Sequence, residues 1–361
     1  MTARSLSSSR VRQWQPRRVL VTRSALGFAH GRAIAERAAR QGIAVVELPG
    51  DRLNLALSAD ERRAYVEAKN TLAVVVAPPS KRRLQPIAPS ADWRIDLAQG
   101  CPAHCSYCYL AGSLKGAPIT RVYANLEQVL EEARDHLGRG LVTSRSAARM
   151  HEGTTFEASC YTDPLSIEAV TGSLSAAIRW FGEWNADAQL RFTTKFAAVE
   201  PLLQLAHNGR TRMRASVNPA AYARFEGGTA PVAQRLQALR RMAEAGYPIG
   251  LTIAPIIAAN GWQTAYAELI AQARAQLADL PGADLTIELI THRFNAGSKA
   301  VLESWYPSSG LDMSGTGRAL KRTRFGAEKV VYDSTTMRVL QDFFERRIAD
   351  DLPHARILYW T

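Results

Sequence analysis

The stretch Gly100-Cys-Pro-Ala-His-Cys-Ser-Tyr-Cys-Tyr-Leu110 holds three of the chain's four cysteines, Cys101, Cys105 and Cys108, in the spacing CxxxCxxC. Three closely spaced thiolates can hold a [4Fe-4S] cluster, which needs four ligands in all. One iron is then left without a protein ligand, and a small molecule can bind to it. The spacing therefore predicts an iron–sulfur cluster with one open coordination position.

The same cysteines could instead combine with His104 in a Cys3His zinc site. Structural zinc sites usually take their ligands from two separated pairs, and the remaining cysteine, Cys160, stands alone in the sequence. A disulfide framework fits less well still, because no secretory signal precedes these cysteines. The cysteine usage indicates a reducing compartment, so we expect a cytoplasmic protein.

The net charge of the chain suggests what it binds. Its 361 residues carry a formal charge of +12, which predicts a polyanionic partner, although a merely basic soluble protein fits the charge alone equally well. No apolar run approaches the roughly 20 residues that a membrane span requires, so no membrane association is expected. Residues 1–17 contain four arginines and no acidic residue, which predicts a disordered basic arm.

Three short apolar runs after this arm predict a small α/β domain over residues 18–90. The runs are Arg18–Thr22, Ile43–Leu48 and Thr71–Ala77, with a helix around Arg32–Arg40 between the first two. The segment Pro78–Pro89, rich in proline and basic residues, is typical of a linker or an exposed loop.

From Trp93 onward, apolar runs alternate with segments of helical periodicity. The candidate strands lie near 93–98, 154–159, 189–194, 212–217, 248–254 and 284–290. One helical face is shared by Leu126, Val129, Leu130, Ala133 and Leu137, and another by Ile167, Val170, Leu174, Ile178 and Phe181. Alternating strands and helices imply a parallel sheet, and six units are too few for the closed eight-stranded barrel.

The sequence therefore predicts an α/β fold with a partial (β/α)6 barrel over residues 91–292. In such folds function lies at the C-terminal ends of the strands, and the cysteine loop follows the first of them. Residues 293–361 are expected to form a C-terminal extension: a basic loop and hairpin, a helix around Thr335–Ile348 and a final strand Ala355–Trp360.

Several segments resemble one known family. An aromatic residue just before the third cysteine, here Tyr107, resembles the pattern of radical S-adenosylmethionine (SAM) enzymes, in which the open iron chelates SAM. Beyond this loop the chain resembles the spore photoproduct lyase family, with similar segments in the same order. These segments are Phe156–Cys160, Arg191–Phe196, His207–Arg212, Ala245–Gly250, Glu288–Phe294 and Arg324–Gly326.

This resemblance implies a radical SAM DNA-repair lyase. Such an enzyme reverses spore photoproduct, 5-thyminyl-5,6-dihydrothymine, to two thymines after a 5′-deoxyadenosyl radical takes a hydrogen atom from C6. The implied cofactors are a [4Fe-4S] cluster and SAM. The implied partners are damaged DNA and an external electron donor of the flavodoxin or ferredoxin type.

The resemblance also implies roles for individual residues. Cys101, Cys105 and Cys108 match the cluster ligands, and Thr162, Asp163, Lys195 and Ser216 match residues that line SAM. Cys160 matches the cysteine that donates a hydrogen atom to the product radical, while Tyr107 and Tyr109 match two tyrosines that help return the hydrogen to SAM.

Taken without the family, the same residues allow simpler interpretations. Cys160 could be a small buried hydrophobic residue. Tyr107 and Tyr109 could simply pack beside the cysteine loop, and Lys195 with Asp163 could be an ordinary ion pair.

The basic C-terminal segment is the candidate DNA contact. Arg324 and Lys329 supply cations for phosphates, and Phe325 supplies an aromatic ring for the space that an extruded lesion vacates. A solvated surface hairpin is the alternative.

Two departures from the family pattern concern the substrate. Tyr161 is bulkier than the family's usual residue beside Cys160, and Phe325 lacks the hydroxyl of the usual tyrosine. They motivate a second reading, a radical SAM enzyme of this family that acts on a different photoproduct or modified nucleic acid. A third reading is a metal-stabilised, non-catalytic nucleic-acid-binding protein.

Overall fold

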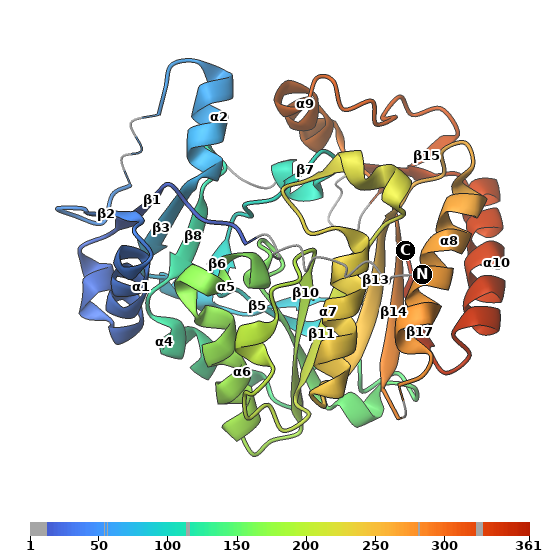
Figure 1. The fold of residues 1–361 in the computed structure, drawn as a ribbon, viewed down its shortest axis with the longest axis horizontal. Coiled ribbons are helices and arrows are strands. Elements are labelled where there is room, and N and C mark those ends of the chain that lie inside the picture. Colours follow the sequence, from blue (N-terminus) through green and yellow to red (C-terminus); the bar gives the residue numbers. More distant parts are fainter. Residues whose placement is uncertain (1–12, 54, 56, 113–115, 281, 323–327) are drawn as a thin grey trace, which may run out of the picture.

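The computed structural model describes residues 13–53, 55, 57–112, 116–280, 282–322 and 328–361. Its framework is a large curled sheet and a smaller sheet beside it, with helices packed around both (Figure 1). None of the helices in these residues is long and apolar enough to cross a membrane.

The large sheet is an open half-barrel, as predicted. Its eight strands follow the order β17-β14-β13-β11-β10-β9-β5-β4, and each neighbouring pair is parallel except β4 with β5. The strands are β4 (Gln85–Ile87), β5 (Ala91–Ile95), β9 (Thr154–Ala158), β10 (Ala188–Thr194), β11 (Thr211–Val217), β13 (Ile249–Ile256), β14 (Leu285–Thr291) and β17 (Arg356–Trp360). All six predicted barrel strands are present, and the predicted final strand adds to β14.

Helices connect these strands and cover the outside of the half-barrel (Figure 1). They are α4 (Leu126–Glu131), α5 (Pro164–Thr171), α6 (Ser173–Glu183), α7 (Val232–Glu244), α8 (Trp262–Leu277) and α10 (Ser334–Asp351). Helix α7 shows why they dock: Leu236, Leu239 and Met242 recur at helical spacing and are all buried. Helical periodicity thus produces the outer layer that the sheet requires.

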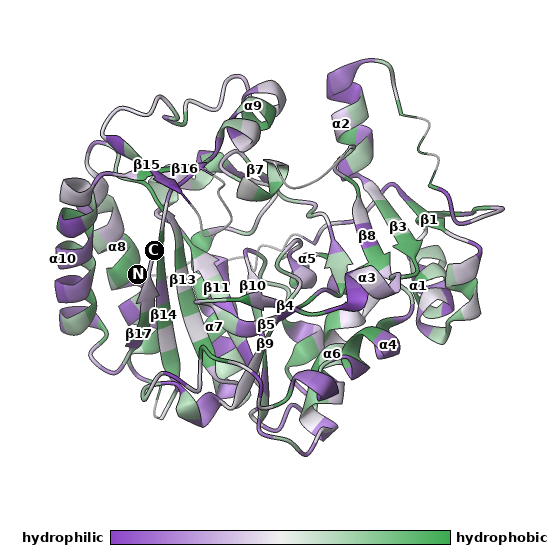
Figure 2. Ribbon diagram, turned by 180° about the vertical axis from the view of Figure 1, so that it is seen from behind, coloured by the Kyte–Doolittle hydropathy of each residue, from purple (hydrophilic) through white to green (hydrophobic). Residues whose placement is uncertain are grey.

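The smaller sheet has the order β2-β1-β3-β8-β6. Its strands are β1 (Arg18–Val21), β2 (Ala44–Glu47), β3 (Thr71–Val75), β6 (Ala98–Gln99) and β8 (Thr120–Tyr123), with helices α1 (Ala29–Arg40), α2 (Glu61–Lys69) and α3 (Pro79–Arg82). The hydrophobic colouring of β1 and β3 in Figure 2 matches their burial. Because β6 and β8 lie beyond residue 90, the sheet takes strands from both sides of the domain boundary proposed there, and that boundary stays a prediction.

The C-terminal extension contains the predicted hairpin and helix. After helix α9 (Ala296–Trp305), strands β15 (Arg318–Arg322) and β16 (Glu328–Tyr332) pair antiparallel. The short strand β7 (His104–Cys105) pairs antiparallel with β12 (Glu226–Gly227). Short 3-10 helices occupy Ser24–Gly27, Tyr109–Gly112, Arg134–His136, Met150–Glu152, Glu200–Leu202 and Ala220–Phe225.

Three local expectations need correction. Segment Pro78–Pro89 is not simply a loop, because it forms α3 and the edge strand β4. Leu137 does not share the buried face of α4, since that helix ends at Glu131 and a 3-10 turn leaves Leu137 exposed at 37%. Within residues 13–17 of the predicted arm, Trp14 packs against both main hydrophobic clusters, so this end of the arm is not free. Residues 1–12 lie outside the described residues.

A network of buried charges lies on the inner face of the half-barrel. Arg214 on β11 forms ion pairs with Glu157 on β9 and Glu288 on β14, and Arg191 on β10 lies 3.7 Å from Glu288. Both arginine side chains are almost fully buried, at 0% and 1% exposed. Thr252 donates to the second oxygen of Glu288 at 3.1 Å. Burial alone would raise the pKa of Glu288, but the two arginines lower it, so the carboxylate stays ionised.

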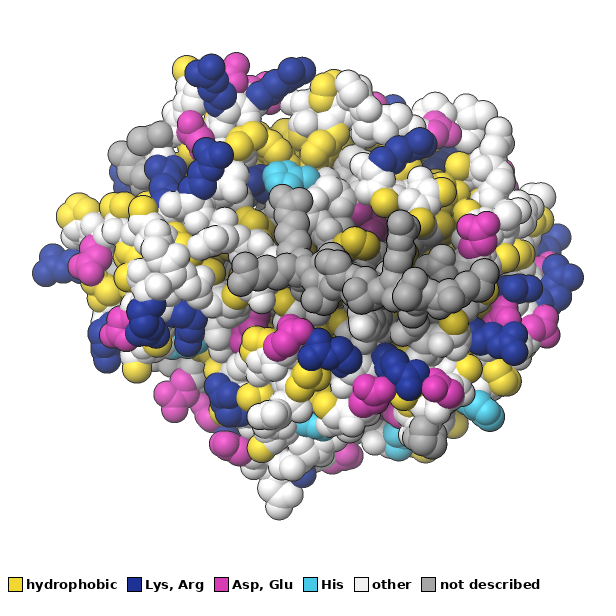
Figure 3. Space-filling model, viewed as in Figure 1, with side chains coloured by type: hydrophobic (Ala, Val, Ile, Leu, Met, Phe, Trp, Pro, Cys, Tyr) yellow, Lys and Arg dark blue, Asp and Glu magenta, His cyan; other side chains and the backbone are white. Residues whose placement is uncertain are grey.

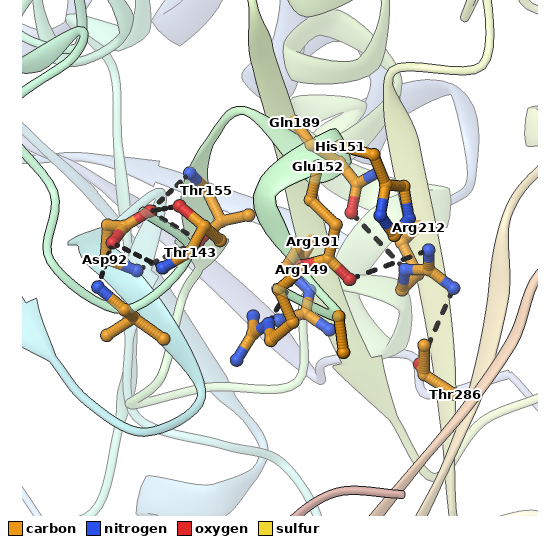
Figure 4. Close-up of polar contacts among 12 residues, drawn as sticks. Asp92, Thr143, Arg149, His151, Glu152, Thr155, Gln189, Arg191, Arg212 and Thr286 are labelled. Atoms are coloured by element: carbon orange, nitrogen blue, oxygen red, sulfur yellow. Dashed lines mark hydrogen bonds and ion pairs between the residues drawn. The ribbon is translucent and has the colours of Figure 1, made fainter. Parts of the chain in front are cut away.

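Two separate polar clusters tie the loop before β9 to the amino ends of the strands (Figure 4). Asp92 accepts hydrogen bonds from the backbone of Val142 and Thr143 and from Thr155. Arg149 pairs with Glu152 at 3.0 Å, and the same carboxylate lies 3.9 Å from Arg212. These contacts close the end of the sheet opposite the cysteine loop.

We predict that Glu288→Gln lowers the free energy of unfolding by about 3 kcal/mol, because the buried guanidinium groups of Arg191 and Arg214 lose a negative charge that balances theirs. Guanidinium chloride unfolding would measure the change. The control is Glu244→Gln, which removes a largely exposed pair with Arg240 and should cost less than about 1 kcal/mol. Equal losses in the two variants would contradict a special contribution from the inner network.

Candidate active site

A cavity of about 360 Å³ opens at the carboxyl ends of the half-barrel strands. It brings together the thiols and SAM-lining residues singled out from the sequence. Its walls include Cys101, Cys105, Tyr107, Cys108, Cys160, Thr162, Asp163, Lys195 and Ser216. Another cavity, of about 420 Å³, lies at the amino ends of the strands beside His151 and Glu152 and contains none of these residues. The chemistry therefore belongs to the first cavity.

The cysteine loop is held from three sides. Pairing of β7 with β12 fixes Cys105 opposite Glu226. The buried Lys69 ammonium donates to the carbonyl oxygens of Cys101 and Ala103 at 2.8 and 2.6 Å. Tyr65 forms a 2.9 Å hydrogen bond with His104 Nδ1. The backbone around the thiols is thereby fixed before any cofactor binds.

Cys101, Cys105 and Cys108 all line the cavity. Among the described residues, no three His, Cys, Asp or Glu side chains are arranged to hold a single metal ion. A [4Fe-4S] cluster offers a different iron to each thiolate, and a set of three cysteine donors suits it. Burial raises the pKa of Cys101 to about 12, whereas the charge of Lys69 acts to lower it. Lys69 forms no ion pair with a carboxylate among the described residues, so its charge is available to an anionic group in the loop.

Lys195, directly after β10, contacts Glu226, a carboxylate that the sequence analysis did not single out. Its ammonium donates to Ser216 Oγ at 2.7 Å and to Glu226 at 3.0 Å. Tyr107 also donates to Glu226, and Arg235 pairs with it at 2.6 Å. Nothing in the spacing around Glu226 marked it, because it lies in an irregular segment whose partners are distant in sequence. The arrangement places a cation, a hydroxyl and a phenol on one wall.

Asp163 and Thr162 follow β9. Asp163 caps α5 by accepting from Ser166 N, and it also accepts from Thr194 Oγ1 at 2.8 Å and from Lys195 N at 2.7 Å. The simple ion pair between Lys195 and Asp163 that the sequence allowed is therefore wrong, since the ammonium pairs with Glu226. Thr162 Oγ1 is buried without a partner among the described atoms. That hydroxyl remains available to a ligand in the cavity.

Cys160 sits directly after a sharp bend. Ser159 has φ of 58°, and its hydroxyl accepts from Leu97 N at 2.9 Å, which holds the bend in place. The Tyr161 carbonyl accepts from Gly100 N at 2.9 Å and so joins this bend to the cysteine loop. Burial raises the pKa of the Cys160 thiol well above its usual value. The side chain is therefore a protonated thiol at neutral pH.

Other predicted site residues are only partly described. Tyr109 begins a 3-10 helix, but its side chain lies outside the described part of the structure, as do Arg324 and Phe325. Lys329 is on β16 opposite Lys321, and burial together with Arg293 and Lys321 lowers its pKa. Like charges this close repel one another, and a bound anion would reduce that repulsion. Elsewhere, Figure 3 shows basic side chains scattered among acidic ones rather than gathered in one patch.

Fold and site together define an α/β half-barrel protein with a cysteine-lined cavity at the carboxyl ends of its strands. The family model described as "Spore photoproduct lyase" matches residues 14–361. The chain belongs to the spore photoproduct lyase family, a family of enzymes.

Individual relatives match over almost their whole length. A spore photoproduct lyase of a Geobacillus species is 36% identical over 348 residues, which cover 96% of this chain and 98% of the relative. The Bacillus subtilis spore photoproduct lyase is 34% identical, with the same coverage of both chains. A solved spore photoproduct lyase complexed with dinucleoside spore photoproduct has a TM-score of 0.88 at 36% identity and covers 97% of this chain and all of its own. A mutant with bound AdoMet and the same dinucleoside also has a TM-score of 0.88.

The geometry around Glu226 predicts a specific acid response. Burial alone would raise its pKa, but Lys195 and Arg235 lower it from 4.5 to about 2. A depressed carboxyl pKa contributes stability that is complete above pH 4.5 and is lost as the pH falls toward about 2. Glu226→Gln should lack this pH-dependent contribution to stability. The denaturant concentration at its unfolding midpoint should therefore change less over that pH interval than the wild-type midpoint does. Denaturant titrations across the interval would show it, and parallel curves for both proteins would contradict the assignment.

Proposed function

We propose that this chain is a radical SAM DNA-repair lyase that converts spore photoproduct into two thymines. The observation that carries the proposal is a single cavity wall shared by the CxxxCxxC thiols, the Lys195–Ser216 pair and the separate thiol Cys160. Family membership and the relatives solved with dinucleoside spore photoproduct and AdoMet support it.

Cys101, Cys105 and Cys108 would hold the [4Fe-4S] cluster, and Lys195, Ser216 and Thr162 would bind SAM beside it. When bound, the cluster and SAM supply, by one-electron reduction from a flavodoxin- or ferredoxin-type donor, the organic radical that takes a hydrogen atom from C6 of the lesion. Lys195 suits the SAM carboxylate because it is a point cation with three donors. Asp163 would act by holding Lys195 and Thr194 in place.

Cys160 would complete the repair. After the bridge between the thymines breaks, a thymine methyl radical needs one hydrogen atom, and the Cys160 S–H can give it as a new C–H bond forms. A protonated thiol is required for this transfer, and the buried environment of Cys160 favours that form. Tyr107 and Tyr109 would help pass a hydrogen atom back, with Tyr107 anchored through Glu226.

The C-terminal hairpin would contact DNA. Arg293 lines the cavity, and Arg293 and Lys321 lie close enough to Lys329 to lower its pKa. Arg324 and Phe325 lie between β15 and β16 in the sequence. Phosphates would bind these cations while the lesion is swung out of the duplex. We propose a DNA-contacting extension at residues 293–361 and a catalytic half-barrel at 91–292, whose sheet gains its two edge strands from β4 and from β17 of the extension.

One observation favours a second candidate, the same chemistry on a different photoproduct. The Arg94 guanidinium lies 4.5 Å from the centre of the Tyr161 ring, and Asp96 pairs with Arg94 at 3.2 Å. This stack holds Tyr161, the bulky departure that follows Cys160 in the chain, in a defined position, and that departure supports a lesion of different shape. Anaerobic turnover with defined thymine photoproducts, followed by product analysis, distinguishes the two substrates.

We predict that Cys160→Ala keeps its iron and still cleaves SAM but no longer gives clean thymine, because the product radical lacks its hydrogen donor. Cys105→Ala is the matched variant and should lose both iron and SAM cleavage. Iron analysis and chromatography of the products after anaerobic turnover provide the readouts. Loss of iron from the Cys160 variant would instead make Cys160 a cluster ligand.

We predict that Arg324→Ala or Phe325→Ala lowers turnover on a lesion in duplex DNA far more than on the bare dinucleotide, which has no stack to open. Lys329→Ala should instead weaken duplex binding and reduce the slope of log affinity against log salt by about 1. Turnover assays on both substrates and salt-dependent binding measure these effects. Equal losses on both substrates would place Arg324 and Phe325 in the chemical pocket.

A further inference from the structure

His292 lines the same cavity, and neither the sequence motifs nor the proposed chemistry uses it. It follows β14 directly, and its backbone N–H donates to Ile256 O at 2.9 Å. The residue is only 1% exposed, yet it forms part of the cavity wall. A buried histidine at the carboxyl end of a strand is placed to contact whatever occupies the cavity.

Arg318 on β15 fixes the tautomer of this ring. One guanidinium nitrogen donates to His292 O at 2.8 Å, and another lies 3.0 Å from His292 Nδ1. A guanidinium has donors only, so Nδ1 must accept and the ring proton must be on Nε2. Arg318 is itself held, because its guanidinium lies 4.0 Å from the centre of the Tyr332 ring and 5.4 Å from that of Phe294.

The Nε2–H group has no partner in the part of the chain that the structure describes. Burial and the neighbouring Arg318 charge lower the pKa of His292 to about 3, so the ring is neutral at physiological pH. Nε2 is buried and makes no hydrogen bond to any described atom. A buried donor left unpaired is unfavourable, and a ligand acceptor in the cavity would remove that cost.

We propose that His292 Nε2–H is a binding group for the substrate and donates to a carbonyl oxygen of the lesion's pyrimidine rings. A neutral donor suits an uncharged carbonyl, whereas a phosphate or the SAM carboxylate is better matched by cations such as Lys195 and Lys329. Arg318 positions the donor and also belongs to the hairpin strand β15. The inference rests on the proposed function, because it takes the occupant of the cavity to be a pyrimidine photoproduct.

Two substitutions at His292 distinguish the contribution of Nδ1 from that of Nε2. His292→Asn can keep an acceptor near Nδ1 for Arg318 but has no group that reaches the place of Nε2. His292→Gln extends an amide N–H to that place. His354→Gln changes an exposed histidine in the turn before β17 and serves as the control.

The test measures the affinity of the reconstituted full-length enzyme for dinucleoside spore photoproduct. The Asn variant should bind about 10-fold more weakly, as expected for one lost hydrogen bond to a buried group. The Gln variant and the control should bind the dinucleoside with an affinity close to that of wild type. Thermal unfolding midpoints confirm that each variant is folded.

The outcomes test two claims, the role of His292 and the proposed function. Wild-type affinity in the Asn variant would overturn the assignment, and so would equal weakening in the folded Asn and Gln variants. If the Asn variant does not fold, the Gln variant decides, since a loss of affinity there contradicts a donor at Nε2. Failure of the wild-type enzyme to bind the dinucleoside would instead reject the proposed function itself.

Discussion

The charge balance inside the half-barrel is the constraint on which the rest of the structure depends. An open barrel lacks the closing strands that would fill its centre with apolar side chains, and here Arg191, Arg214, Glu157 and Glu288 occupy that space. Each buried charge needs an opposite charge from a different strand. The network therefore joins β9, β10, β11 and β14 and holds their carboxyl ends in one fixed array around the cavity.

The same principle operates at the candidate active site. The Glu226 carboxylate forms ion pairs with Lys195 and Arg235 and accepts a hydrogen bond from the Tyr107 hydroxyl. Lys195, which is expected to contact SAM, is therefore already held in position beside the cysteine loop. A site organised in this way loses little conformational freedom when a ligand binds. His292, oriented through Arg318, extends this organisation to the side of the cavity nearest the hairpin.

Local pattern was sufficient to predict the parallel half-barrel, because each of its strands is an apolar run flanked by helical periodicity. Local pattern also singled out the cysteine loop, whereas the role of Cys160 came from the family resemblance and stays a prediction. The pattern failed at Leu137, because the helix ends at Glu131, before its apolar spacing suggests, and at β4, an edge strand within a proline-rich segment. Glu226 and the Arg318–His292 pair could not be predicted, since their partners are brought together only by tertiary folding.

One hydrogen bond, from Gly100 N to Tyr161 O, has a consequence for how the protein matures. Gly100 follows β6 of the smaller sheet, whereas Tyr161 follows β9 of the half-barrel, so the cysteine loop lies at the seam between the two sheets. Lys69, which supports that loop, ends a helix of the N-terminal region. The thiols reach their final places only when both sheets have formed and docked. The proposed cluster would then be bound late, and its presence would report the completed fold.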